Sequence, residues 1–194
     1  MSTTPRPSAL SRTLALIPPA VALVAQQADA GSLFLKVDVS SGPVITGEST
    51  DIKHSGWIEI LSMQTGVSNT VTLGSGGITA GKSTRADLVV TKFLDKASPP
   101  LFLGCAVGTR YPTVTLELTN SNSDGASLTY YKITLNNVIV SSLGTSAGGD
   151  RPTESVSLSY ERITTDYYMQ DGKGNIPTTP TATMTWNFAT NSSK

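Results

Sequence analysis

The stretch from Pro112 to Thr119, PTVTLELT, decides the fold class. Apolar and polar residues alternate along it, so that one face carries Val114, Leu116 and Leu118. Successive side chains of a β-strand point to opposite faces of a sheet, so the alternation predicts a strand with one buried and one polar face. Half-burial of this kind is typical of antiparallel sheets.

The same alternation recurs along the chain from Gly31 onward, interrupted by Gly, Pro, Asn and Ser. The other strands are predicted at residues 32–39, 56–64, 85–93, 127–140, 153–168 and 181–188. One short helix is expected within residues 97–108, where Ser98 would cap the start, proline suits the first turn and Gly108 would end it. Seven strands and one short helix predict a mostly β chain, an antiparallel sandwich or small barrel.

The composition is neutral and poor in charge. Fourteen Lys and Arg residues balance fourteen Asp and Glu residues, so no net field attracts nucleic acid or an anionic membrane. Charged residues make up 14% of the chain, below the roughly 25% of an average soluble domain. We therefore expect no nucleic-acid partner, and a weakly charged surface is compatible with self-assembly.

The first thirty residues differ from the rest. Arg6 and Arg12 precede an apolar run, Leu14–Ala25, and the small residues Ala28–Ala30 follow it, which is the pattern of a secretory signal. The run is shorter than the roughly twenty residues of a membrane span. The alternatives are an unstructured extension or a start codon placed too early. The chain is thus divided into a signal-like or disordered extension, 1–30, and one domain, 31–194.

The segments 72–84 and 142–150 are rich in Gly and Ser and read as long connections. The first contains GGITAGKS, Gly76–Ser83, which fits the phosphate-loop spacing. A phosphate loop needs a helix that begins at the lysine, whereas Val89 and Val90 follow in a strand-like run. We interpret the match as accidental, and a nucleotide hydrolase acting through Lys82 and Ser83 as a minor alternative.

The lone cysteine and the lone histidine limit the chemistry. Cys105 cannot form an intrachain disulfide and is interpreted as a small core residue. His54, in DIKHSGWIEILS (51–62), is either a hydrolase base or a residue half-buried at a contact beside Trp57. Since no nucleophile-elbow pattern occurs, the contact is favoured. No catalytic, cofactor or metal residues are predicted.

Several motifs in order resemble one family. They are LFLKVD, GES followed by KHSGWIEILS, the segment from AGKSTRADLVVTKFLDKASPP to GTRYP, YYKITLNNVIVSS and PTESVSLSYERITTDY, with WNF closing the match at Phe188. Together they resemble the Hcp family, the haemolysin-coregulated tube proteins of bacterial type VI secretion. The resemblance implies a two-sheet β-barrel with one helix, and a homohexameric ring with an open lumen.

The resemblance also implies a function and candidate residues. Rings would stack into a tube that meets a contractile sheath and tube-tip proteins and carries small effectors in its lumen. This role is structural rather than enzymatic. His54, Trp57 and Lys82 are the candidate subunit or ring-stacking contacts. After ILS the family often has aromatic residues around a serine, whereas this chain has Met63, Gln64 and Thr65 there. If this stretch faces the lumen, Gln64 is the candidate lumen contact, and the preference for cargo would differ.

The expected location follows from the same resemblance. Tube subunits assemble in the cytoplasm and leave through type VI secretion, with no membrane span. A working leader at residues 1–30 would instead send the chain to the periplasm. The alternative function is therefore an exported Hcp-like paralogue that binds an effector or partner outside the cytoplasm.

Overall fold

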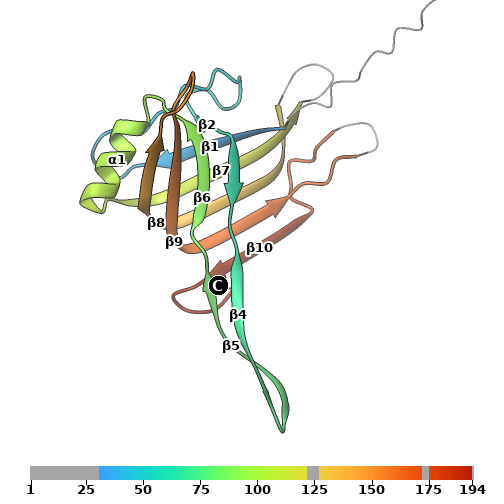
Figure 1. Ribbon diagram of the computed structural model, residues 1–194. Coiled ribbons are helices and arrows are strands. Elements are labelled where there is room, and N and C mark those ends of the chain that lie inside the picture. Colours follow the sequence, from blue (N-terminus) through green and yellow to red (C-terminus); the bar gives the residue numbers. More distant parts are fainter. Residues whose placement is uncertain (1–30, 122–126, 172–174, 194) are drawn as a thin grey trace, which may run out of the picture.

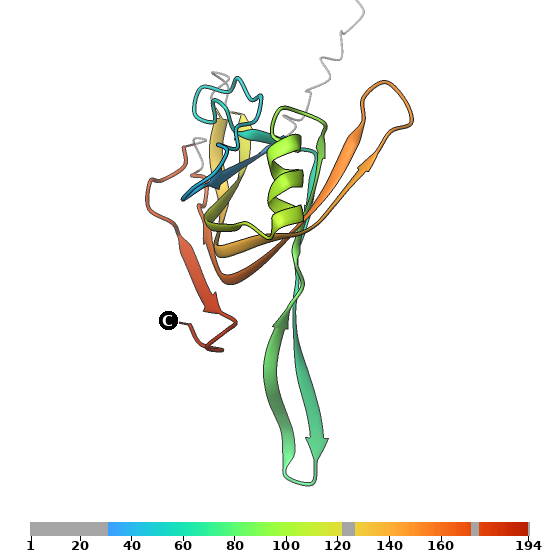
Figure 2. The same ribbon diagram turned by 90° about the vertical axis from the view of Figure 1, so that its left-hand side faces the viewer.

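The computed structural model describes residues 31–121, 127–171 and 175–193, so the extension predicted at 1–30 lies outside the described residues. Within these ranges the chain forms ten strands and one helix (Figures 1 and 2). In chain order they are β1 (Ser32–Asp38), β2 (Ile58–Ile60), β3 (Ser62–Gln64), β4 (Val67–Gly74), β5 (Gly77–Arg85), β6 (Leu88–Phe93), α1 (Ser98–Val107), β7 (Arg110–Ser121), β8 (Ser127–Ser146), β9 (Thr153–Tyr167) and β10 (Ala182–Asn187).

One antiparallel sheet curls into a nearly closed barrel. Its strand order is β2-β1-β7-β8-β9-β6-β3, and β10 pairs with the second half of β9. Only Leu61 separates β2, which pairs with β1, from β3, which pairs with β6. The Leu61 N–H donates to the Thr91 carbonyl at 2.7 Å, so one kinked segment joins the two edges of the sheet. The predicted mostly β barrel with a single helix is confirmed.

The apolar side chains that alternate along the strands point inward and fill the barrel. In β7, Val114 and Leu116 are each 1% exposed, whereas Thr115 between them is only partly buried. Burial of one such aliphatic side chain contributes about 1.5–3 kcal/mol to folding. Inward side chains of the other strands complete the same core, among them Leu35, Ile58, Leu88, Val90, Ile133, Leu135, Val156 and Leu158. Cys105 is partly buried and packs against this core.

Helix α1 packs beside β8 and ends as its sequence predicts. Prolines occupy its first turn, and Gly108 follows it with φ +69°, a left-handed conformation that glycine adopts without steric cost. The prediction that Ser98 caps the helix is wrong, because Ala97 is the N-cap residue. The Ser98 hydroxyl is instead directed into the barrel, where it donates to Glu154 at 2.6 Å.

The two predicted connections are largely strand. Residues 72–84 belong mostly to β4 and β5, which form a two-stranded antiparallel hairpin of their own. Residues 142–146 extend β8, which pairs with β9 as far as Ser146. Glycine and serine give these segments little apolar alternation, so the period-two signal that reveals the other strands is missing.

Candidate assembly surfaces

The β4–β5 hairpin stands away from the barrel (Figures 1 and 2). Leu73 and Ile78 face each other across its two strands and are 79% and 75% exposed. Val67 and Val71 on β4 are exposed as well. A two-stranded ribbon is marginally stable alone, and clustered exposed aliphatic side chains mark a surface that binds a protein. The hairpin is therefore the first candidate surface for assembly.

Lys82 and Ser83 lie on this hairpin. Both are strand residues of β5, and no helix begins at Lys82, so the geometry of a phosphate loop is absent. Lys82 is exposed. The Ser83 hydroxyl donates to Asn191 Oδ1 at 2.9 Å and accepts a hydrogen bond from Trp186 Nε1 at 3.0 Å. Ser83 thus anchors the hairpin to β10 and to the chain that follows it.

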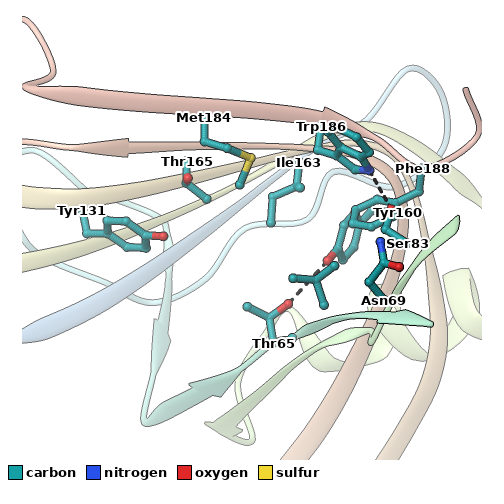
Figure 3. Close-up of a pocket in the computed structure, with 12 residues that line it drawn as sticks. Thr65, Asn69, Ser83, Tyr131, Tyr160, Ile163, Thr165, Met184, Trp186 and Phe188 are labelled. Atoms are coloured by element: carbon teal, nitrogen blue, oxygen red, sulfur yellow. Dashed lines mark hydrogen bonds between the residues drawn. The ribbon is translucent and has the colours of Figure 1, made fainter. Parts of the chain in front are cut away.

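A largely apolar pocket of about 440 Å³ lies at the root of the hairpin (Figure 3). Tyr160 and Thr65 approach each other across it, with 3.4 Å between their hydroxyl oxygens. Its lining contains no charged residue and comprises Thr65, Gly66, Val67, Asn69, Ser83, Tyr131, Tyr160, Ile163, Thr165, Met184, Trp186 and Phe188. A concave apolar surface with a few polar groups can receive aliphatic side chains.

The outer side of α1 is a second apolar surface. The helix contains no charged residue, and Phe102, Leu103 and Val107 are 63%, 48% and 67% exposed. A helix that is apolar on all sides is normally buried against other structure. This helix is therefore the second candidate surface for assembly.

His54 lies inside the fold, with 2% of its surface exposed. Its Nδ1 lies 2.6 Å from Asp51 Oδ1, and its Nε2 lies 3.1 Å from Glu117 Oε2. Both ring nitrogens thus face carboxylates inside the fold, and neither is directed towards solvent or a substrate. The hydrolase hypothesis therefore lacks an accessible base.

The imidazole also holds the loop between β1 and β2 against the barrel. It stacks on Phe34 with ring centroids 4.3 Å apart, and Trp57 meets its edge at 4.9 Å. Gly47 permits the return of the loop, because a Cβ there would lie 2.2 Å from the Trp57 carbonyl oxygen. His54 thus supports a surface loop from within, and a contact of this loop with another copy stays a prediction.

The carboxylates of this cluster predict a dependence of stability on pH. Burial alone would raise the pKa of Asp51, but hydrogen bonds from Ser127 and His54 outweigh it and lower the pKa to about 2. Burial likewise opposes ionisation of Glu117, yet hydrogen bonds from Thr129 and His54 lower its pKa. Both groups bind protons more tightly in the unfolded chain, so their stabilisation is present above pH 4–5 and is lost as the pH falls towards 2.

We expect Asp51→Asn to reduce this acid sensitivity. The urea unfolding midpoint of the unmodified chain should fall between pH 4 and pH 2, and the midpoint of the variant should start lower and fall less. Lys53→Gln, a change at an exposed neighbour, is the matched control and should follow the unmodified chain. Parallel curves for the unmodified chain and Asp51→Asn would show that Asp51 does not carry the effect.

The other two candidate residues lie apart. Trp57 is partly buried beside His54, whereas Gln64 is exposed on β3, opposite Val89 of β6. The structure therefore brings His54 and Trp57 together and leaves Lys82 and Gln64 on separate surfaces. Their roles as contacts stay predictions.

The sequence analysis missed a buried ionic cluster at Lys92. This side chain is fully buried, and its Nζ lies 2.7 Å from Asp95 Oδ1, 2.8 Å from Glu154 Oε2 and 2.9 Å from Ser98 Oγ. It also donates to the Phe93 carbonyl at 2.8 Å. The cluster ties β6, the start of α1 and β9 together inside the fold, which is a structural role.

In the parts of the chain that the structure describes, no group of three or more His, Cys, Asp or Glu side chains is suited to a metal ion. None of the helices described is long and apolar enough to cross a membrane.

The family model for "Type VI secretion system effector, Hcp" matches residues 34–167. The chain belongs to the Hcp family. Among curated proteins, the chain is similar to Protein hcp1 of Pseudomonas aeruginosa, with 38% identity over 90 aligned residues. The alignment covers 45% of this chain and 55% of that relative. The alignment thus spans about half of the length of the curated relative.

Solved structures of Hcp proteins share the fold. One described as a type six secretion system protein has 32% identity and a TM-score of 0.74, covering 85% of this chain and all of that one. Hcp1 from Salmonella typhimurium has 28% identity and a TM-score of 0.66, covering 85% and 99% of the two chains. The resemblance inferred from the ordered motifs is confirmed. It relates this chain to type VI secretion, and the Hcp family is one of structural, secreted proteins.

Proposed function

We propose that this chain is a structural subunit of the type VI secretion tube, which forms six-membered rings that stack into an exported conduit. The observation that carries the proposal is the β4–β5 hairpin, which exposes aliphatic side chains away from the barrel. A contact between this hairpin and a different surface of the next copy is heterologous, and such contacts generate rings or stacks. The apolar pocket at the hairpin root and the apolar side of α1 are the proposed receiving surfaces.

The lumen wall is proposed on the face of the sheet that carries Gln64. Pairing across β3, β6, β9 and β8 places uncharged residues in two adjacent rows, Ser62–Thr91–Ser155–Gly144 and Gln64–Val89–Ser157–Ser142. These two rows carry no charge and no large apolar side chain, so this part of the wall would neither repel nor trap a passing protein. Effector carriage, with Gln64 among the contacts, is the role proposed for this face.

The proposed partners are further copies of the chain, a contractile sheath, tube-tip proteins and small effectors. Trp57, Lys82 and the loop supported by His54 are proposed contacts between copies. Assembly in the cytoplasm and export through type VI secretion complete the proposal.

The direct test is the solution mass of residues 31–194, measured by light scattering, together with negative-stain images of the same sample. We expect a mass near six times that of the chain and annular particles. A monomer at every concentration tested would overturn the proposal. Turnover assays of Lys82→Ala and His54→Ala, compared with the unmodified chain, test the enzymatic alternatives separately.

A second candidate function rests on the pattern of the first thirty residues. Arg6, Arg12, the apolar run and Ala28–Ala30 favour an exported Hcp-like protein that binds an effector or partner outside the cytoplasm. N-terminal sequencing of protein recovered from the periplasm distinguishes the two. Mature protein that begins at Gly31 would favour the exported binding protein.

A further inference from the structure

A second pocket, of about 260 Å³, lies on the face of the sheet proposed as the lumen wall, beside the root of the hairpin. Arg110, Ile139 and Ser159 follow one another in register across β7, β8 and β9 and form part of its lining. Arg85, the last residue of β5, reaches this row and donates through its Nη2 to the Ser159 hydroxyl at 2.9 Å. Two arginines thus border one hollow with Ile139 between them.

The guanidinium of Arg85 is fixed in place before any ligand arrives. It lies over the ring of Tyr160 at 5.4 Å and over the ring of Phe188 at 5.8 Å. Both contacts favour a cation, and the planar group loses little further freedom when it binds. A held guanidinium offers its donors in the paired geometry that matches a carboxylate or phosphate group.

The same guanidinium is not fully satisfied by the protein. The Nε of Arg85 is buried and has no hydrogen-bond partner among the described residues. Within those residues, neither Arg85 nor Arg110 lies within ion-pair distance of a carboxylate. The buried Nε is itself out of reach of a ligand, but two guanidinium groups without a carboxylate at ion-pair distance leave other donors at the pocket for an acceptor.

The one carboxylate in the pocket lining is already held by amides. Glu161 accepts hydrogen bonds from Asn137 Nδ2 at 2.8 Å and from Asn187 Nδ2 at 3.4 Å. These bonds, together with the charges of Arg162 and Arg110, lower the pKa of Glu161. The pocket therefore carries two positive charges and one negative charge, which leaves a net positive charge for a ligand.

We propose that the pocket between Arg85 and Arg110 binds an oxyanion, that is, a carboxylate or phosphate group. The Nη atoms of Arg85 and the guanidinium of Arg110 are the donors, and Ile139 is the floor between them. The oxyanion comes either from a free anion or from an acidic side chain of a neighbouring copy. Binding to a free anion is independent of assembly, whereas the second source rests on the proposed function.

The test compares the full chain with Arg110→Gln and with the control Arg162→Gln, an exposed arginine of β9 outside the pocket. Thermal unfolding is followed in inorganic phosphate and in chloride at equal ionic strength. Once phosphate exceeds its Kd several-fold, linkage predicts a rise of about 2–4 °C in the unfolding midpoint relative to chloride. Arg110→Gln should lose this rise, and Arg162→Gln should keep it.

Light scattering of the same samples identifies the source of the oxyanion. A phosphate-specific rise with unchanged mass supports a free anion. A lower mass in phosphate and in Arg110→Gln, but not in Arg162→Gln, supports a carboxylate of the neighbouring copy. If phosphate changes neither midpoint nor mass and Arg110→Gln assembles normally, the proposal is wrong. A chain that stays monomeric throughout would contradict the proposed function, while the phosphate comparison would still test the site.

Discussion

Leu73→Asp is expected to prevent the association of copies while leaving the barrel folded. Leu73 is 79% exposed at the end of β4, so an aspartate there costs the single chain little. In a contact between copies, the same change removes a buried leucine, which contributes about 1.5–3 kcal/mol, and places a charge against an uncharged surface. Association should therefore weaken by about 10- to 100-fold per contact. Light scattering over a range of concentrations, with negative-stain images, measures the loss.

The matched control for this experiment is Thr72→Asp. Thr72 is the preceding residue of the same strand, is exposed, and points to the opposite face of the hairpin. The substitution Thr72→Asp therefore introduces the same charge at nearly the same place. We expect Thr72→Asp to assemble more strongly than Leu73→Asp. If both variants lose association equally, the added charge alone causes the effect. If Leu73→Asp assembles normally, the apolar side of the hairpin is excluded as a contact.

The hairpin also marks a limit of sequence-based prediction. Alternation identified the barrel strands because one face of each lies against the core, as with Val114 and Leu116 in β7. The residues of β4 are all exposed, so no core imposes a period of two on the sequence there. The glycines and serines of residues 72–84 therefore read as a connection. A strand whose side chains meet no core of its own chain leaves this weak signal.

The buried polar clusters show a second limit. Glu117 lies on the outward face of β7, which the alternation predicts to be polar, yet the loop that carries His54 covers it. Alternation specifies which face of a strand is inward, and it cannot tell what a long loop covers on the other face. The sequence did not reveal the partners of His54 for this reason, and its place in a contact loop stays a prediction.

Lys92 and Glu154, by contrast, could have been found from the sequence. Lys92 has the same parity as the buried residues Leu88 and Val90, and Glu154 has the same parity as Val156. Two opposite charges at inward positions of strands predict a buried pair, because an isolated buried charge is too costly. The register bears this out, since Lys92 and Glu154 lie directly opposite each other across β6 and β9.

Lys92→Met is expected to be the most destabilising substitution considered for this chain. Methionine fills much of the space but leaves the carboxylates of Asp95 and Glu154 buried without their cation. Removal of one partner from a buried ion pair costs about 3–5 kcal/mol, because the remaining charge is uncompensated. Chemical denaturation at one fixed protein concentration measures the loss, since association would otherwise shift the apparent stability. Lys96→Met, at an exposed lysine outside the proposed contacts, is the control and should change stability by less than about 0.5 kcal/mol.

A second variant separates the charge from the packing. In Lys92→Met with Glu154→Gln, one of the two uncompensated charges is gone while the shape of the cluster is nearly kept, so part of the lost stability should return. If the double variant is as unstable as the single one, the loss arises from packing or from Asp95, and the pairing of Lys92 with Glu154 contributes little. If Lys92→Met itself unfolds within about 1 kcal/mol of the unmodified chain, the barrel tolerates the buried carboxylates by taking up protons or water. In that case the cluster would not be what ties the start of α1 to the sheet.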